Sequence, residues 1–123
     1  MGLSGSFTDN ACSGGIYAAI DIEKGVICTP AVSDDFEVQY YTHPSTGVQI
    51  PGFKIPMWED VLKMIHSCYD ALPYAKYVGW DIAISIDGPL IIEANCGCPA
   101  IELLQKPFVP LGEGKRAVFS KYL

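Results

Sequence analysis

Two acidic residues and one amide residue interrupt an otherwise apolar stretch near the end of the chain. Residues 79–100 read GWDIAISIDGPLIIEANCGCPA, and the interruptions are Asp81, Glu93 and Asn95. The β-branched and apolar residues around them predict a β-hairpin over residues 77–95 with a tight turn at its Asp-Gly pair. Whether these oxygen-bearing side chains can act together depends on the face of the hairpin that each one occupies.

The length of the turn decides how the faces are shared. A two-residue loop of Asp87 and Gly88 would place Asp81 and Glu93 on opposite faces. A three-residue loop from Ile86 to Gly88, with Gly88 in the left-handed conformation, would place Asp81 directly opposite Glu93. We expect the three-residue loop, because glycine suits its last position and the register separates polar from apolar side chains.

The expected register makes further pairings. Ala83 should lie opposite Ile91, and Trp80 should point to the core. The apolar face should carry Ile82, Ile84, Leu90 and Ile92.

Convergence of Asp81, Glu93 and Asn95 predicts a metal site. Two carboxylates that face each other across strands repel unless a cation lies between them. Carboxylate and amide oxygens are hard ligands, and Mg²⁺ typically combines one or two carboxylates with water and substrate phosphates. We therefore expect Mg²⁺ with a polyphosphate. The alternative is a solvated face of an antiparallel sheet, which is common in such sheets.

One helix is clearly signalled upstream of the hairpin. Apolar residues recur at three- and four-residue spacing in MWEDVLKMIHSCYDAL, which predicts a helix over residues 57–72. Pro56 suits its first turn, Glu59 and Asp60 complement the helix dipole, and Pro73 ends it.

The remaining segments are mostly short strands and loops. The glycine-rich residues 1–15 predict a loop. Residues 16–22 and 26–32 predict a hairpin in which Gly25 supplies the left-handed residue. Residues 33–56 predict a long loop with one irregular strand.

Together these elements predict one domain of the α+β class over residues 1–123, an antiparallel sheet with helices on one face. Two short helices, at residues 99–105 and 112–121, are weakly signalled and complete the expected set.

Composition excludes several classes of partner. The chain has 123 residues, is 50% hydrophobic and carries a formal net charge of −6, which disfavours nucleic acid and anionic membranes. Neither a transmembrane segment nor a signal peptide is apparent, so we expect a cytoplasmic protein. Five cysteines without framework spacing favour reduced thiols over a disulfide scaffold.

Several motifs resemble one protein family. They are NACSGGIYAAIDIEKGVI, THPSTG, IPGFKIPMWEDV, YVGWDIAI, the E-x-N element and IELLQ. In this order and spacing they resemble the sugar-transfer-associated branch of the ATP-grasp proteins, from about Asn10 to Gln105. The resemblance implies an ATP-dependent ligase that joins a carboxylate to an amine or similar nucleophile through an acyl phosphate, linked to saccharide metabolism.

The resemblance also implies roles for particular residues. Asp81, Glu93 and Asn95 would bind Mg²⁺ and, through it, ATP. The residues near the transferring phosphate or the acyl substrate would be Asn10, Gly14 and Gly15.

The chain resembles the carboxyl-terminal half of an ATP-grasp domain. The half with the adenine pocket and the phosphate-holding lysines has no counterpart in the sequence, and the family's arginine before N-x-x-x-G-G is missing, the only arginine being Arg116. The expected partners are therefore nucleotide, a small substrate, and either an amino-terminal ATP-grasp half or a second copy of the chain. Whether this chain alone is an enzyme stays open.

Two other functions compete with the ligase hypothesis. The chain could be a non-catalytic ATP-grasp remnant that binds a carbohydrate or a protein. A thiolate metal carrier built on Cys96 and Cys98 is the third hypothesis, disfavoured because a second closely spaced cysteine pair is absent from the sequence.

Overall fold

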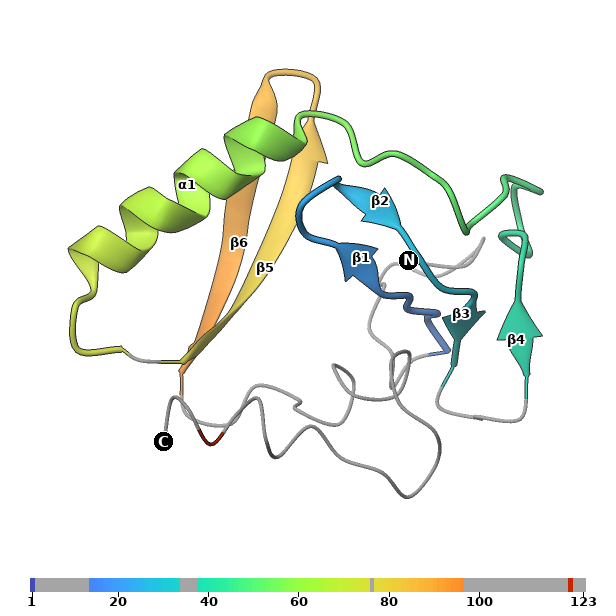
Figure 1. Cartoon of the computed structure of the whole chain (residues 1–123), viewed down its shortest axis with the longest axis horizontal. Coiled ribbons are helices and arrows are strands. Elements are labelled where there is room, and N and C mark those ends of the chain that lie inside the picture. Colours follow the sequence, from blue (N-terminus) through green and yellow to red (C-terminus); the bar gives the residue numbers. More distant parts are fainter. Residues whose placement is uncertain (2–13, 34–37, 76, 97–119, 121–123) are drawn as a thin grey trace.

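A computed structural model of the chain describes residues 1, 14–33, 38–75, 77–96 and 120. Within these residues, three two-stranded antiparallel sheets and one helix form an α+β arrangement, which confirms the expected fold class (Figure 1). The elements in chain order are β1 (Ile20–Asp21), β2 (Val26–Ile27), β3 (Ala31–Val32), β4 (Gln39–Tyr40), α1 (Trp58–Ala71), β5 (Val78–Ser85) and β6 (Gly88–Cys96).

Strands β1 and β2 form the expected first hairpin. Ile20 pairs with Ile27 and Asp21 with Val26. The Asp21 carboxylate accepts hydrogen bonds from backbone N–H groups in the turn, which stabilises the turn locally. Gly25 closes the turn with φ +65°, so it is the left-handed residue that the sequence predicts.

The second short sheet continues from the first hairpin. Strand β3 pairs with β4, and an isolated bridge between Tyr17 and Val32 connects β3 to the segment before β1. The expected strand over residues 26–32 is therefore divided into β2 and β3. Bridges from Thr42 to Gln49 and from Val26 to Lys54 give the segment after β4 more regularity than the expected loop. We refer to residues 14–33 and 38–55 as the β1–β4 unit.

Most of the buried apolar side chains among the described residues belong to this unit. Its core is a cluster of aliphatic residues, Ile16, Ile27, Ala31 and Ile50, each with less than a tenth of its surface exposed. Half-buried apolar residues, including Tyr40 and Ile55, pack around them. Burial of these groups is the main favourable contribution to the folding of the unit.

Helix α1 begins one residue later than the sequence predicts. Its N-cap is Met57, which has a left-handed backbone (φ 53°, ψ 30°), so Pro56 precedes the cap instead of lying in the first turn. The acidic residues Glu59 and Asp60 do occupy the first turn. At the other end Leu72 is the C-cap, followed by Pro73, as expected.

Strands β5 and β6 form a long hairpin that lies against α1 (Figure 1). Val78 and Trp80 of β5 line a cavity of about 230 Å³ together with Ile65, Tyr69 and Leu72 from α1 and its C-terminal end. Trp80 therefore faces the helix, which agrees with the expectation that it points to the core. We refer to residues 58–75 and 77–96 as the helix–hairpin unit.

The hairpin loop differs from both loops considered from the sequence. Ser85 pairs with Gly88, so the loop has two residues, Ile86 and Asp87. The Ser85 hydroxyl accepts a hydrogen bond from the Asp87 N–H (3.1 Å) and donates one to the Gly88 carbonyl (2.9 Å). Gly88 has φ +132°, which is positive but outside the left-handed helical region, so the expected three-residue loop is wrong.

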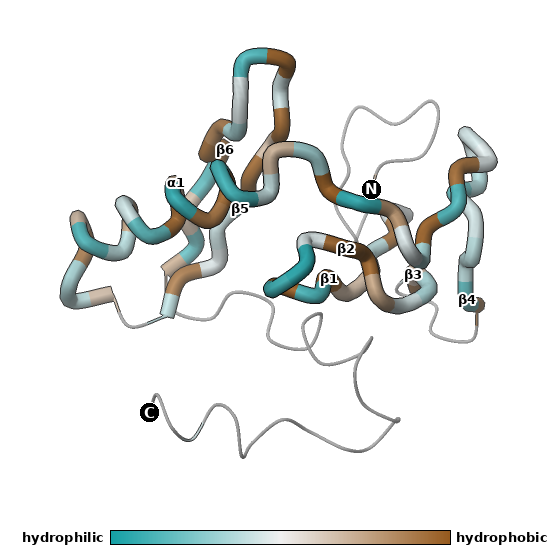
Figure 2. The backbone as a smooth tube through the Cα atoms, turned by 45° about the horizontal axis from the view of Figure 1, so that its top comes forward, coloured by the Kyte–Doolittle hydropathy of each residue, from teal (hydrophilic) through white to brown (hydrophobic). Residues whose placement is uncertain are grey.

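Hydrophobic residues continue to the tip of this hairpin (Figure 2). Among the described residues, no helix is long and apolar enough to span a bilayer.

Candidate metal site

A β-bulge places the two carboxylates opposite each other. Near the turn, Ile82 pairs with Ile91, but the next pair along the strands is Asp81 with Glu93. Ile92 is thus an extra residue on β6, and its side chain is 67% exposed. If the pairing continued past Ile82 and Ile91 without a bulge, Asp81 would pair with Ile92, and Glu93 would point to the other face.

Between the turn and the bulge, the apolar residues are distributed differently from what the sequence predicts. Ala83 lies opposite Leu90, not Ile91, and Ile91 lies opposite Ile82. Leu90 therefore shares the face of Asp81 and Glu93, where it is 54% exposed. The physical reason is the two-residue loop, which shifts every pair between the turn and the bulge by one position on β6 relative to the expected register.

Asn95 completes a polar face. It pairs with Gly79 and lies two residues beyond Glu93, so it occupies the same face of β6. Trp80, between Gly79 and Asp81, points the other way, toward α1. Asp81 and Glu93 are exposed to solvent and Asn95 is half-buried.

No described cation neutralises the two facing carboxylates. In the part of the chain that the structure describes, ion pairs join Lys24 to Asp21 (3.0 Å) and Lys63 to Asp60 (3.1 Å), and neither involves the hairpin. Directly opposed like charges are unfavourable across a sheet. The acidic face is therefore a place where an external cation would be stabilising.

The donor set fits a hard divalent cation that keeps part of its water shell. Over the described residues, no three or more His, Cys, Asp and Glu side chains gather as a metal-binding group. At the hairpin the protein offers two carboxylates, and the third oxygen has to come from the Asn95 amide. Mg²⁺ typically has few protein ligands, and water fills its remaining coordination positions, whereas structural zinc is usually held by four protein ligands.

The expected substrate-proximal residues are only partly described. Asn10 lies outside the described residues. Gly14 is exposed with φ +85°, and Gly15, which follows it, is buried. Both glycines immediately precede the core residue Ile16 of the β1–β4 unit, whereas the polar face belongs to the helix–hairpin unit.

Other expected features fall outside the described residues as well. Cys98, Gln105, Arg116 and the short helices at 99–105 and 112–121 all do. Cys96 ends β6 with an exposed thiol and forms no disulfide.

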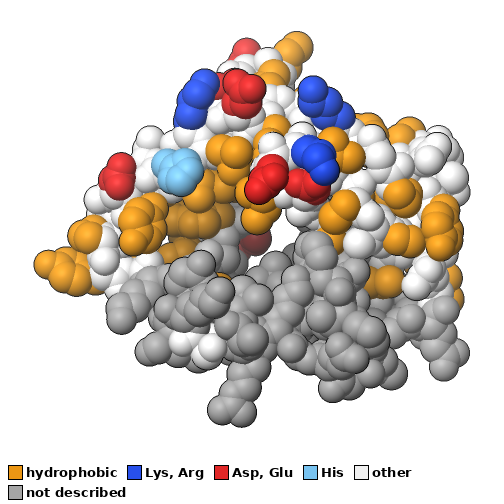
Figure 3. Space-filling view, viewed as in Figure 1, with side chains coloured by type: hydrophobic (Ala, Val, Ile, Leu, Met, Phe, Trp, Pro, Cys, Tyr) orange, Lys and Arg blue, Asp and Glu red, His pale blue; other side chains and the backbone are white. Residues whose placement is uncertain are grey.

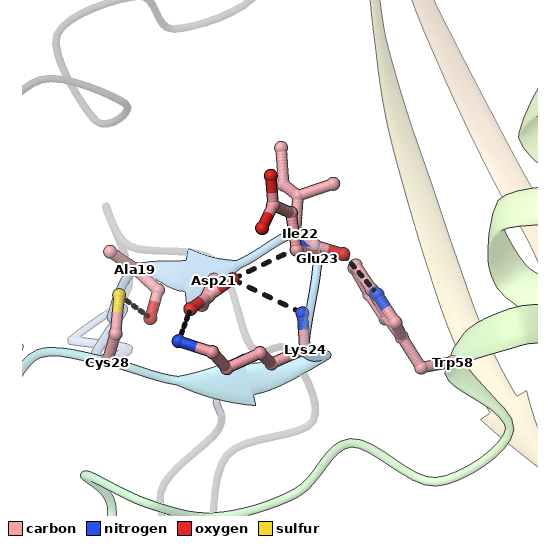
Figure 4. Close-up of polar contacts among 7 residues, drawn as sticks. All are labelled: Ala19, Asp21, Ile22, Glu23, Lys24, Cys28 and Trp58. Atoms are coloured by element: carbon pink, nitrogen blue, oxygen red, sulfur yellow. Dashed lines mark hydrogen bonds and ion pairs between the residues drawn. The ribbon is translucent and has the colours of Figure 1, made fainter.

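A polar contact joins the two units, and sequence reasoning did not find it (Figure 4). Trp58, the first residue of α1, donates a hydrogen bond from Nε1 to the Ile22 carbonyl oxygen in the β1–β2 turn (2.7 Å). Its indole lies over Gly25, since a Cβ atom added there would be only 2.3 Å from Trp58 Cγ. The sequence predicts only that Trp58 packs; its partners are more than thirty positions away and leave no local signal.

In this turn, the pKa of Asp21 is clearly shifted from its ordinary value. The Lys24 ammonium, which forms a side-chain hydrogen bond with the carboxylate, lowers the pKa of Asp21 below its ordinary value of 3.8. Backbone N–H groups of Lys24 and Glu23 act in the same direction, because they also favour the charged form.

A second unexpected feature is an apolar cavity in the β1–β4 unit. It has a volume of about 350 Å³, and its lining includes His43 and Thr46 of the THPSTG motif and the core residue Ile50. The motif itself forms a tight turn, in which Gly47 N–H donates to the His43 carbonyl oxygen (2.8 Å).

Comparison with known families identifies the chain. The family model described as sugar-transfer associated ATP-grasp matches residues 1–109. The chain belongs to this family, and the matched range includes the hairpin with its polar face and the expected substrate-proximal stretch. Comparisons with curated proteins and with solved structures found no match.

Proposed function

We propose that this chain carries the metal-binding portion of an ATP- and Mg²⁺-dependent ligase. The reaction would join a carboxylate to an amine or similar nucleophile through an acyl phosphate, in saccharide-related metabolism in the cytoplasm. Membership of the ATP-grasp family supports the nucleotide part of this proposal. The direct pairing of Asp81 with Glu93 carries the metal part.

The roles of the three side chains follow from their chemistry. Asp81 and Glu93 would supply anionic oxygens and Asn95 a neutral one, leaving the other positions around the metal to water and phosphate oxygens. Mg²⁺, when bound, neutralises charge on the phosphate groups during transfer. The hairpin's own contribution is to hold the ligands on one face, because the strand pairing fixes which side chains face each other.

The glycine stretch would lie near the transferring phosphate. We assign Asn10, Gly14 and Gly15 to this position on the strength of the family match. The positive φ of Gly14 supports the assignment, because backbone of this kind can turn successive N–H groups toward an anion.

The site also needs groups that hold the adenine and the phosphates, and we propose that a lysine-bearing ATP-grasp half supplies them. The hairpin exposes the apolar side chains of Ile86 (92%), Ile92 (67%) and Leu90 (54%). In the face shown in Figure 3, hydrophobic side chains also gather along the side of α1. Exposed apolar surface of this kind is a typical docking surface, and a second copy of the chain is the competing occupant.

The same exposed surface favours one competing function, a non-catalytic remnant that acts as an interaction domain. The two functions differ in what they require of the polar face. A remnant has no use for a facing pair of carboxylates, whereas a ligase needs them for the metal.

Binding of Mn²⁺ in place of Mg²⁺ tests the proposal directly. Free Mn²⁺ gives a six-line paramagnetic resonance spectrum that is lost on binding, so titration of the protein measures occupancy. We expect binding that Mg²⁺ displaces and that Glu93→Gln weakens at least tenfold. Asp87→Asn, which removes a carboxylate from the hairpin loop, is the matched control and should bind normally. Equal binding by wild type and Glu93→Gln would contradict the proposal and favour the remnant.

A further inference from the structure

The two units meet where the chain enters α1. Residues 53–55 pair with β2, through a bridge between Val26 and Lys54 and a hydrogen bond from Ile55 N–H to the Gly25 carbonyl oxygen (2.8 Å). Three residues after Ile55, α1 begins with Trp58 and belongs to the other unit. Among the described residues, Met57 and Trp58 therefore lie where the chain passes from one unit to the other.

Trp58 attaches the first turn of α1 to the β1–β2 turn in two ways. Its indole N–H donates to the Ile22 carbonyl oxygen at 2.7 Å, which is short for an N–H···O bond (Figure 4). The ring also lies directly over Gly25, where the absence of a side chain permits the close approach. A hydrogen bond and a shape-matched contact together fix both the position and the rotation of the ring.

Met57 has a backbone conformation that is unfavourable for a non-glycine residue. Its φ of 53° lies in the left-handed region, and among the described residues no other non-glycine residue has a positive φ. No side chain caps the helix at this position. Strained backbone persists only where surrounding contacts impose it, and such residues cluster at switch regions.

Space for movement adjoins the same residues. A cavity of about 430 Å³ is lined by Met57 and Trp58 together with Lys54 and the turn residues Glu23 and Lys24. Close packing normally prevents a large ring from changing position in a protein interior. At Trp58 the ring has a tight contact on one side and an open cavity beside it.

We propose that Met57 and Trp58 form a hinge and latch that set the orientation of the helix–hairpin unit relative to the β1–β4 unit. Because α1 lies against the β5–β6 hairpin, a rotation at Met57 moves the hairpin and its polar face together with the helix. Trp58 is thus a positioning residue for Asp81 and Glu93 and touches neither. This consequence for the metal site rests on the proposed function, whereas the joint itself does not.

Distances between spin labels on the two units test the joint without any ligand. The labels would be attached at Ser45 in the β1–β4 unit and at Asp87 in the hairpin loop, both exposed, after replacement of the native cysteines. We expect one narrow distance distribution for the parent protein. Trp58→Ala should broaden it at least twofold, and Trp58→Phe, which keeps a ring but lacks the N–H donor, should broaden it less.

Trp80→Phe is the matched control. It changes a tryptophan that lies inside the helix–hairpin unit, so it should lower stability without changing the distance between the units. If Trp58→Ala fails to fold, Trp58→Phe decides the question by the same readout. A folded Trp58→Ala or Trp58→Phe protein with the parent distribution would overturn the proposal.

Addition of Mg²⁺ and ATP to the labelled protein separates this proposal from the proposed function. A narrow distribution that depends on Trp58, in a protein that binds no Mg²⁺, would support the joint and contradict the ligase function. Mg²⁺ binding that depends on Glu93, together with a distance distribution that is the same in the Trp58 variants as in the parent, would support the ligase function and contradict the joint.

Discussion

Asp81 and Glu93 are direct cross-strand partners in the β5–β6 hairpin, and the pair lies immediately beyond the β-bulge at Ile92. Two like charges in this position weaken a sheet. The ion pairs among the described residues lie elsewhere, so no described cation offsets the unfavourable pair. An arrangement that costs stability and places oxygen ligands on one face is more readily explained by a bound cation than by folding.

Removal of one charge from this pair should stabilise the metal-free protein. In the presence of a chelator, we expect Glu93→Gln to raise the free energy of unfolding by about 0.2–1 kcal/mol, the usual size of cross-strand pair effects. Denaturant unfolding measures the difference. Asp87→Asn is the control and should change little, since Asp87 lies in the loop without a facing carboxylate. A clear loss of stability in Glu93→Gln would contradict the repulsion.

Deletion of Ile92 should leave metal binding intact. The deletion removes the bulge and leaves a regular ladder in which the glutamate still faces Asp81, because Ile91 keeps its place opposite Ile82. Deletion of Ala94 is the comparison: it moves Asn95 to the other face and should weaken Mn²⁺ binding. Circular dichroism would first establish that both proteins fold. Equal effects of the two deletions would show that strand register does not determine binding.

Gly25→Ala should be much more destabilising than Gly47→Ala. Both glycines have similar positive φ values, +65° and +70°, so both substitutions carry a backbone cost of about 1–2 kcal/mol. At Gly25 the new Cβ would also lie 2.3 Å from Trp58, whereas nothing lies within 4 Å at Gly47. We expect a loss of about 3 kcal/mol at Gly25 because overpacking adds to the strain.

A double variant separates the two causes. Trp58→Ala should remove the overpacking part of the Gly25→Ala effect, so the losses would not add. Fully additive losses would show that Trp58 and Gly25 are not in contact.

Acid should weaken the β1–β2 turn through Asp21. The hydrogen bond with Lys24 holds the pKa of Asp21 below its ordinary value of 3.8, so folding favours the charged form. The contribution is present above the unfolded pKa and is lost as the pH falls through the folded pKa. Asp21→Asn keeps an oxygen acceptor for the turn but cannot titrate. Its unfolding free energy should therefore fall less than that of the parent protein between about pH 5 and about pH 2. If the unfolding free energies of Asp21→Asn and the parent protein fall equally with pH, Asp21 does not cause the loss of stability in acid.

Local patterns in the sequence predict much of this architecture. The apolar spacing and the acidic first turn locate α1 to within one residue at each end, and Gly25 identifies its turn because few other residues adopt positive φ. The pairing of Asp81 with Glu93 is also as predicted, although the expected loop was wrong. A two-residue loop and a bulge each shift the register by one, and together they give the same pair.

Some features of the structure have no local signal in the sequence. They depend on contacts between residues far apart in the chain, or on a choice between two identical adjacent residues. Ile91 and Ile92 are identical, so no pattern shows which of them is the extra residue. Trp58 looks like any apolar residue at a helix start, and its contacts with Ile22 and Gly25 appear only when the β1–β2 turn is in place. The left-handed backbone of Met57 is equally hidden, since methionine has no preference for it.

Calorimetric titration of Mg²⁺ in the presence of ATP or ADP tests the central claim most directly. We predict heat of binding for the parent protein and for Asp87→Asn, and its loss in Glu93→Gln and Asp81→Asn while the fold is retained. Binding that is unchanged in both hairpin-face variants, or absent from the parent protein, would contradict the assignment of Asp81, Glu93 and Asn95 as a magnesium site.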